Sequence, residues 1–217
     1  SNNIPNMTLN TPYYSSARAP YGFNADTMFL LDENKYPTLA PLIQTLKTWD
    51  HNTNPQSKGA LIYNLAYYHI PTIMGGRKND KLTMKEAIAT YEYVYDFLMK
   101  NYNRLDVSLG EVQRLVRGDE NWPQGGIPDV LAAVMSEPFG KAQRRMNSGD
   151  AYIGFVRFPK DGSLPLIETV NTFGASSNKE DAHYADQRAM YQAQQVKKMT
   201  LDKNEVLKNA ERTYHPQ

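Results

Sequence analysis

The fold is best inferred from Val170-Asn171-Thr172-Phe173-Gly174-Ala175-Ser176-Ser177, followed by Asp181-Ala182-His183-Tyr184-Ala185-Asp186-Gln187. The stretch begins at the end of an extended run and passes into small residues, a pattern typical of a strand that ends in a turn. We expect a helix to follow, from Asp181 to about Lys198. The stretch therefore predicts a strand, a turn and a helix in direct succession.

The residues just upstream predict the partner of this strand. Tyr152–Phe158 and Leu164–Val170 are both rich in β-branched and aromatic residues, and the turn formers Lys160-Asp161-Gly162 separate them. Pro165 cannot donate a hydrogen bond within a sheet, so we place it at the start of the second strand or on an edge. Together these segments predict a β-hairpin.

Helical periodicity dominates the middle of the chain, with apolar residues at spacings of three and four. Capping-box sequences mark several of the helix starts. We expect helices over Leu39–Trp49, over Gln56–His69 with Pro71 ending it, from Thr83 to Tyr102, from Ser108 to about Gly118, and after Asp202.

The chain divides into three regions on this basis. Residues 1–35 form an irregular or extended initial segment, residues 36–118 a helical region, and residues 119–217 a loop, a β-hairpin and C-terminal helices. Residues 121–128 are too rich in Gly and Pro for regular structure. The predicted fold class is α+β, helix-rich with a C-terminal hairpin.

Composition excludes several classes of function. The chain has 217 residues, enough for a core of its own, and a formal net charge of +1, so nucleic acid is not expected as a partner. It has no cysteine, which excludes disulfides, thiolate nucleophiles and zinc–thiolate sites. The four histidines show no i, i+4 pair typical of a helical metal site, and no phosphate-binding loop or Gly-x-Ser-x-Gly turn is present.

Membrane and targeting segments are also not recognised in the sequence. No apolar run approaches the about 20 residues that cross a bilayer. The first residues, Ser1-Asn2-Asn3-Ile4-Pro5, lack the basic start and apolar stretch of a signal peptide. We expect the chain to be a mature product or a cut fragment.

Several short motifs occur in an order that resembles a known family. The motifs are Asn2-Asn3-Ile4-Pro5, Trp49-Asp50 with Ser57-Lys58-Gly59-Ala60, Gly118-Asp119, Gly126-Ile127-Pro128-Asp129, Gly149-Asp150-Ala151-Tyr152, and the closing stretch quoted first. They resemble the penicillin acylase family, and most closely its acyl-homoserine lactone and aculeacin acylase branch. The resemblance touches most of the chain.

This resemblance implies an N-terminal-nucleophile hydrolase with an αββα sandwich, which cleaves linear amides. The chain would be the C-terminal part of the larger (beta) subunit. An amidase needs a donor for the oxygen that gains charge in the tetrahedral intermediate, and the resemblance gives this role to Asn2. On its own, the Asn2-Asn3 pair is also typical of an Asn-rich turn before Pro5.

The resemblance also bears on the nucleophile. Ser1 is one candidate, but Pro5 interrupts the long buried strand that should present a nucleophile, so we favour one outside this chain. The family often has an arginine soon after the Asn-Asn-x-Pro element, and Arg18 is the nearest one here.

Partners, cofactors and location follow from the family alone. The expected partners are the remaining segments of the same precursor, namely the small subunit and the N-terminal part of the large subunit, and a small-molecule amide substrate. No cofactor is identifiable in the chain, and calcium is possible by resemblance. A periplasmic or secreted location is implied.

One rival hypothesis is a non-enzymatic module. The chain has 15 tyrosines. Those on the Thr83–Tyr102 helix, with the Trp122 loop, could stack on a sugar or peptide. The alternative interpretation of the tyrosines is amphipathic packing.

Overall fold

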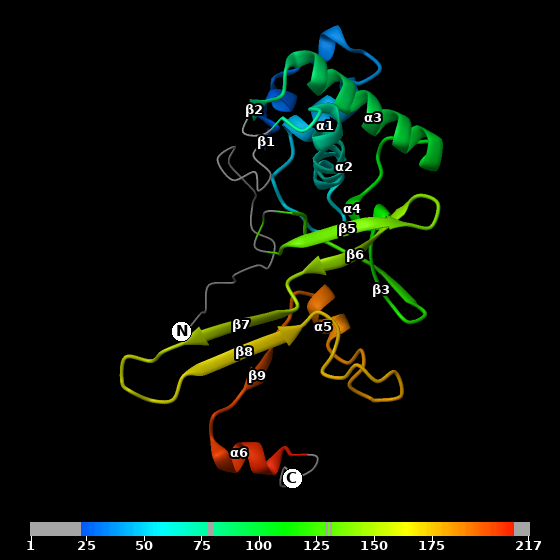
Figure 1. Ribbon diagram of the computed structural model, residues 1–217. Coiled ribbons are helices and arrows are strands. Elements are labelled where there is room, and N and C mark those ends of the chain that lie inside the picture. The colour runs from blue at the N-terminus through cyan, green and yellow to red at the C-terminus, as the bar shows by residue number, and fades with distance from the viewer. Residues whose placement is uncertain (1–22, 78–79, 129, 131, 211–217) are drawn as a thin grey trace. The chain divides into compact units, whose positions relative to one another are not determined.

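The computed structural model describes residues 23–77, 80–128, 130 and 132–210. The chain folds as two compact units that divide between Gly149 and Asp150. Both contain β-sheet and helix (Figure 1), so the α+β class is confirmed. None of the helices within these ranges is both long and apolar enough to cross a membrane.

The first unit is built around three helices, α1 (Ala40–Lys47), α2 (Lys58–Ile73) and α3 (Met84–Tyr102). Helix α2 is buried almost all round from Gly59 to Tyr67, as expected of a helix with apolar residues on every side. Both α1 and α3 contact it. The core side chains from these helices include Leu42, Ile43, Leu46, Leu61, Ile62, Leu65, Ile70, Tyr91, Val94 and Leu98.

The predicted end of α2 at Pro71 was wrong. The helix continues to Ile73, with Pro71 in its last turn. Ile70 and Met74, on either side of the proline, are both buried, and the Met74 N–H donates to the Ile70 carbonyl over 2.9 Å. Burial of these side chains therefore outweighs the hydrogen bond that the proline removes.

Helix α3 begins at the predicted capping box. The Thr83 hydroxyl accepts from the Glu86 N–H at 3.2 Å, and the Glu86 carboxylate accepts from the Thr83 N–H at 2.8 Å. The backbone hydrogen bond from Thr83 lowers the pKa of Glu86, although slight burial opposes it, and nearby Arg77 lowers it further. The helix ends at Asn103, which has a left-handed conformation (φ 53°).

A mixed sheet completes the first unit, with the order β4-β3-β6-β5. Strand β3 pairs antiparallel with β4 and parallel with β6, and β5 pairs antiparallel with β6. The strands are β3 (Gln113–Arg117), β4 (Glu120–Pro123), β5 (Val134–Phe139) and β6 (Gln143–Gly149). Outside this sheet lie β1 (Phe23–Asn24), paired parallel with β2 (Asp80–Lys81), and the 3-10 helices η2 (Asp26–Leu30) and η3 (Glu33–Lys35).

The predicted helix from Ser108 to Gly118 is confirmed only for its first turn, α4 (Leu109–Val112). The chain then becomes β3, because Gln113 and Leu115 are buried while Arg114 and Val116 are half-buried, which is the period of a strand. Strand β4 likewise occupies the first part of the predicted irregular segment 121–128.

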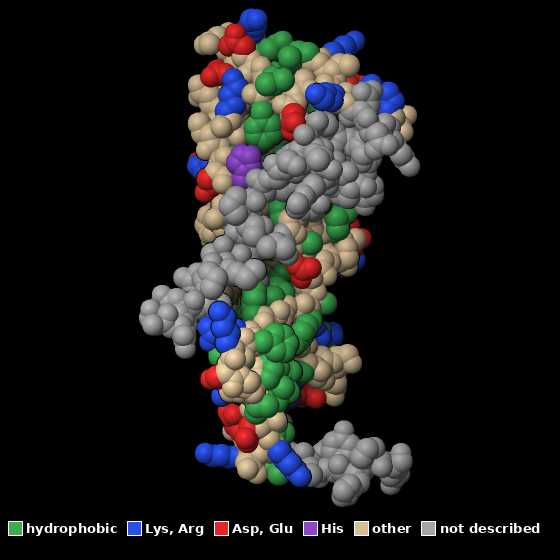
Figure 2. Space-filling model, turned by 90° about the vertical axis from the view of Figure 1, so that its left-hand side faces the viewer, with side chains coloured by type: hydrophobic (Ala, Val, Ile, Leu, Met, Phe, Trp, Pro, Cys, Tyr) green, Lys and Arg blue, Asp and Glu red, His purple; other side chains and the backbone are tan. Residues whose placement is uncertain are grey.

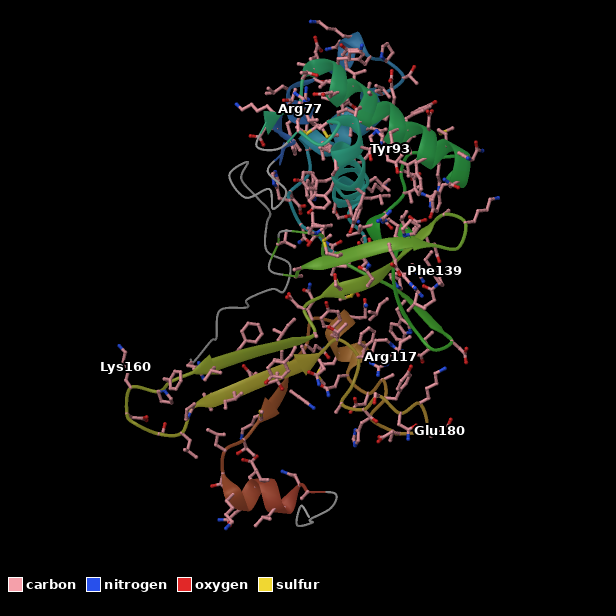
Figure 3. The ribbon with its side chains drawn as sticks, viewed as in Figure 1. Arg77, Tyr93, Arg117, Phe139, Lys160 and Glu180 are labelled. Carbon is pink, nitrogen blue, oxygen red and sulfur yellow. The ribbon has the colours of Figure 1, made fainter. Side chains whose placement is uncertain are left out.

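The second unit contains a three-stranded antiparallel sheet with the order β7-β8-β9. The predicted hairpin is confirmed as β7 (Tyr152–Arg157) and β8 (Leu166–Asn171), and Pro165 precedes β8. Lys160 lies at the tip of this hairpin (Figure 3). Helix α6 (Lys203–Lys208) starts at Asp202, whose carboxylate accepts from the Glu205 N–H, as predicted.

The predicted helix from Asp181 to Lys198 was wrong over most of its length. Only α5 (Arg188–Gln192) is helical, and β9 (Lys197–Met199) adds to the sheet. Residues 181–187 form turns, in which the carboxylates of Asp181 and Asp186 bind nearby donors. Such local bonds compete with a helix. Gln194 has a positive φ of 56°, where the chain leaves α5.

Thr83→Ala should lower the free energy of unfolding of this chain by about 1 kcal/mol, because the first turn of α3 loses a hydrogen-bond acceptor. Urea unfolding followed by circular dichroism measures it. Thr45→Ala is the matched control, because this half-buried threonine lies inside α1, where its hydroxyl donates to the Pro41 carbonyl; its effect should stay within about 0.5 kcal/mol. Equal effects of the two changes would contradict the role of the cap.

Candidate functional site

The predicted oxyanion donor Asn2 lies outside the described residues, as do Ser1 and Arg18. Five of the six motifs that pointed to function fall wholly or mostly on described residues. At three of them, the Trp49 motif, the Gly126 motif and the closing stretch, two segments approach closely.

The Trp49 motif joins the end of α1 to the start of α2. The Trp49 side chain is buried against Gly59, and a Cβ atom at Gly59 would lie 2.3 Å from Trp49 Cγ. The indole N–H donates to the Asn52 carbonyl at 2.8 Å, and the His51 ring stacks on the indole with centroids 5.1 Å apart. Ser57 caps α2 by accepting from the Ala60 N–H. The spacing between Trp49 and Gly59 in this motif is therefore explained by the packing of the indole on the glycine.

The loop between α1 and α2 is bound to two later segments through its backbone. The Thr53 carbonyl accepts from the Gly126 N–H at 2.8 Å. The Pro55 carbonyl accepts from the Gly110 N–H at 2.7 Å, and the Ser57 carbonyl from the Leu109 N–H at 2.9 Å. These bonds bring the start of α4 and the segment 124–127 against the loop.

A buried pair of amides holds the same segment from the other side. Gln113 Nε2 donates to the carbonyls of Gly126, at 2.7 Å, and Gln124, at 3.3 Å. Gln113 Oε1 accepts from Asn64 Nδ2 at 3.0 Å. Both side chains are fully buried. The carbonyls require a donor, so they fix the orientation of the Gln113 amide and, through it, that of Asn64.

Neither amide was recognised from the sequence. The available signal was Asn64 itself, which interrupts the apolar run Leu61-Ile62-Tyr63 and Leu65-Ala66. A polar side chain on a fully buried helix requires a hydrogen-bond partner, so its presence predicts a buried network. The partner could not be identified, because Gln113 was assigned to a helix.

In the second unit, the closing stretch folds back on itself around Gly174. A Cβ atom there would lie 2.1 Å from the His183 carbonyl oxygen, so a larger residue does not fit. The Ser176 N–H donates to that carbonyl at 3.1 Å. The Gln187 N–H donates to the Phe173 carbonyl at 3.0 Å, and its side-chain oxygen accepts from the Asn171 N–H at 3.1 Å. Gln187 therefore ties the turn to the end of β8.

The same turn contains the residue types of a hydrolase triad, in a different arrangement. His183 Nδ1 lies 2.8 Å from an Asp186 carboxylate oxygen. The pKa of Asp181 is lowered by the His183 backbone N–H and then by the side chain of Ser176. The Ser176 side chain thus bonds to the carboxylate of Asp181, and the His183 imidazole bonds to the carboxylate of Asp186. These bonds stabilise the turn, and we assign them a structural role.

Most of the α3 tyrosines pack against other parts of the first unit. Tyr91 is fully buried, its hydroxyl donates to the Met28 carbonyl at 3.1 Å, and burial raises its pKa. Tyr93, labelled in Figure 3, stacks on His69 with centroids 3.9 Å apart, and burial lowers the pKa of His69. The Tyr102 hydroxyl donates to the Ala142 carbonyl at 3.2 Å.

Tyr68 of α2 makes a similar contact with the sheet. Its hydroxyl accepts from the Ser136 N–H at 2.7 Å, and the guanidinium of Arg144 lies 3.7 Å from the ring centroid. These tyrosines therefore join the helices to one another and to the strands. The contacts support amphipathic packing and give no exposed stacking surface on α3 of the kind that the rival hypothesis requires.

Within the described ranges, no three His, Asp or Glu side chains gather as a metal site. Asp129, the acidic residue of one motif, lies outside those ranges. Calcium therefore remains an expectation from the family resemblance.

The family model described as penicillin amidase matches residues 13–208. An acyl-homoserine lactone acylase, PvdQ, from Pseudomonas fluorescens is 32% identical over 89 residues, which cover 40% of this chain and 11% of the relative. The PvdQ acylase of Pseudomonas putida is 33% identical over 90 residues, with the same coverage. The aligned part of the chain thus spans about a tenth of these relatives.

Gln113→Leu should lower the free energy of unfolding of the chain by at least about 2 kcal/mol, since each buried polar group left without a partner costs roughly 1–3 kcal/mol. Urea unfolding measures the change. Gln44→Leu on the exposed side of α1 is the control, with an expected change within about 0.5 kcal/mol. A Gln113→Leu chain as stable as the unsubstituted one would show that the amide pair is unimportant.

Gly174→Ala should destabilise the closing turn by about 1–3 kcal/mol, because the new methyl group overlaps the His183 carbonyl. Hydrogen exchange of the Ser176 and Gln187 amides should become faster. The control is Gly154→Ala, where the nearest atom, 3.2 Å from the Cβ position, belongs to the mobile end of the Tyr152 side chain. Unchanged exchange in Gly174→Ala would refute the close approach.

Proposed function

This chain belongs to the penicillin amidase family, and from that membership we propose that it is part of an enzyme that hydrolyses amides. The observation that carries the proposal is the family match over residues 13–208, which includes nearly all of both units. The Gly174 turn supports it, because it gives the closing stretch that resembles the family a defined structural purpose.

We propose amides with an acyl chain as the substrate class. Both relatives are named acyl-homoserine lactone acylases. An acylase of this kind breaks the bond between the acyl carbonyl and the amine nitrogen, and it leaves the lactone ring closed. The substrate proposed for the complete enzyme is therefore an acylated homoserine lactone or a related amide.

The proposed reaction follows the chemistry of an N-terminal-nucleophile hydrolase. A hydroxyl outside this chain attacks the acyl carbonyl, and the α-amino group of the same residue accepts its proton. An α-amino group has a pKa of about 7.7–8.0, so it is partly unprotonated near neutral pH. The amine leaves, and water then releases the acyl group from the enzyme.

Asn2 is the residue of this chain that we propose acts directly on the reacting atoms. Its side-chain N–H would donate to the carbonyl oxygen as that oxygen becomes negatively charged. The described residues would contribute the rigid framework, together with part of the proposed αββα sandwich. The remaining segments of the precursor would supply the nucleophile, the acyl-chain pocket and any calcium site. A periplasmic or secreted location is proposed on the same family basis.

Asn2→Ala in the full-length enzyme should lower kcat by roughly 100- to 1,000-fold, the range found when one oxyanion donor is removed. KM and the thermal unfolding temperature should change little, because the donor acts mainly in the transition state. Amine release from an acylated substrate measures the rate.

Asn3→Ala is the control for this experiment, since the resemblance assigns the donor role to the first asparagine of the pair. It should retain most of the activity. Undiminished turnover by Asn2→Ala, or an equal loss in both variants, would contradict the assignment of Asn2.

A further inference from the structure

Exposed apolar side chains are concentrated in the second unit. Figure 2 shows hydrophobic side chains gathered at the height of the β7–β8 hairpin. The large hydrophobic residues exposed in this unit are Tyr152, Val156, Phe158, Leu164, Leu166, Met199, Leu201, Val206 and Leu207. By contrast, the buried hydrophobic residues among its described positions are Val170 and Tyr191. This unit has little core of its own.

The strand register places several of these residues on one face of the sheet. Val156 pairs with Ile167, and Ile167 pairs with Met199, so the three form a row across β7, β8 and β9. Tyr152 lies on the same side of β7, since its ring leans over Gly154. We call the surface of Tyr152, Val156, Ile167 and Met199 the Val156 face.

Apolar residues occupy both faces of this sheet, because the register places Ile153, Phe155, Leu166 and Val170 on the face opposite Val156. Val156 and Met199 are 51% and 42% exposed. The opposite face is the better covered one along β7, where Ile153, Phe155 and Arg157 are half-buried. That face nevertheless bears the charges of Arg157, Glu168 and Lys198, the last two opposite each other in the register.

On the Val156 face, the charged residue within the paired strands is Lys197, opposite Thr169. Thr169 is buried, next to Gly154 and the Tyr152 ring. An antiparallel sheet with one solvated face normally places its polar residues on that face. The exposed apolar side chains of Tyr152, Val156 and Met199 therefore indicate that this face is covered in the complete protein.

We propose that the Val156 face is a docking surface for another segment of the same polypeptide, one that presents an uncharged, apolar face. This rests on the proposed function, in which the chain is part of a longer enzyme. The aligned part of each relative is 11% of its length, so most of such a polypeptide lies in other segments. A unit with so few buried side chains needs a permanent cover, which a segment of the same polypeptide provides.

Cysteine labelling tests this surface, because the chain has no cysteine of its own. Met199→Cys and Lys198→Cys are neighbours on β9 that occupy opposite faces. In the polypeptide expressed from the complete reading frame, a thiol at Met199 should react at least about tenfold more slowly with a maleimide than one at Lys198, because labelling then requires local opening. The unsubstituted polypeptide gives the background.

Val156→Cys is the second test position, should Met199→Cys fail to fold. It should show the same protection, at a rate independent of protein concentration. Fast labelling at both test positions overturns the proposal, as does equal protection at Lys198. Protection that disappears on dilution also overturns it, because a second copy would then be the occupant.

The labelling result is independent of catalysis. A protected Val156 face in a polypeptide that cleaves no amide would leave the docking surface intact and contradict the proposed function. Freely labelled thiols at Val156 and Met199 in an enzyme that cleaves amides would contradict the docking surface and leave the proposed function intact.

Discussion

The first unit depends on the buried carboxamide of Gln113. A buried amide must satisfy both its donor and its acceptor, and Gln113 does so with Asn64 on one side and the carbonyls of residues 124 and 126 on the other. This single group joins the central helix α2, the first residue of β3 and the segment 124–126. The Thr53 carbonyl holds that segment from the α1–α2 loop. Helices and sheet are thereby fixed to each other at this point.

The second unit has the opposite character. It satisfies its backbone in the sheet and in the turn around Gly174, but it buries few apolar side chains. The incompletely buried second unit fits the proposal that this chain is one segment of a larger enzyme. Within a hydrolase of the penicillin amidase family, such a segment would position the oxyanion donor proposed at Asn2 and supply surfaces for the remaining polypeptide.

Local signals in the sequence predicted the elements whose stability is local. The capping box at Thr83, the cap at Asp202 and the hairpin around Lys160 were all recovered, because each depends on residues within a few positions of one another. Two of the failures have tertiary causes. Gln113–Arg117 became a strand through pairing with residues 120–123 and 144–145, and α2 continued through Pro71 because its neighbours are buried. Order among the short motifs identified the family, although each motif alone was weak.

The most direct measurement is product analysis after the full-length enzyme acts on an acylated homoserine lactone. If the assignment to amide hydrolases is right, mass spectrometry will detect free fatty acid and homoserine lactone in equal amounts, because the amide bond is the one broken. A product with the amide intact and the lactone ring opened, or no turnover of any acylated amine, would contradict it.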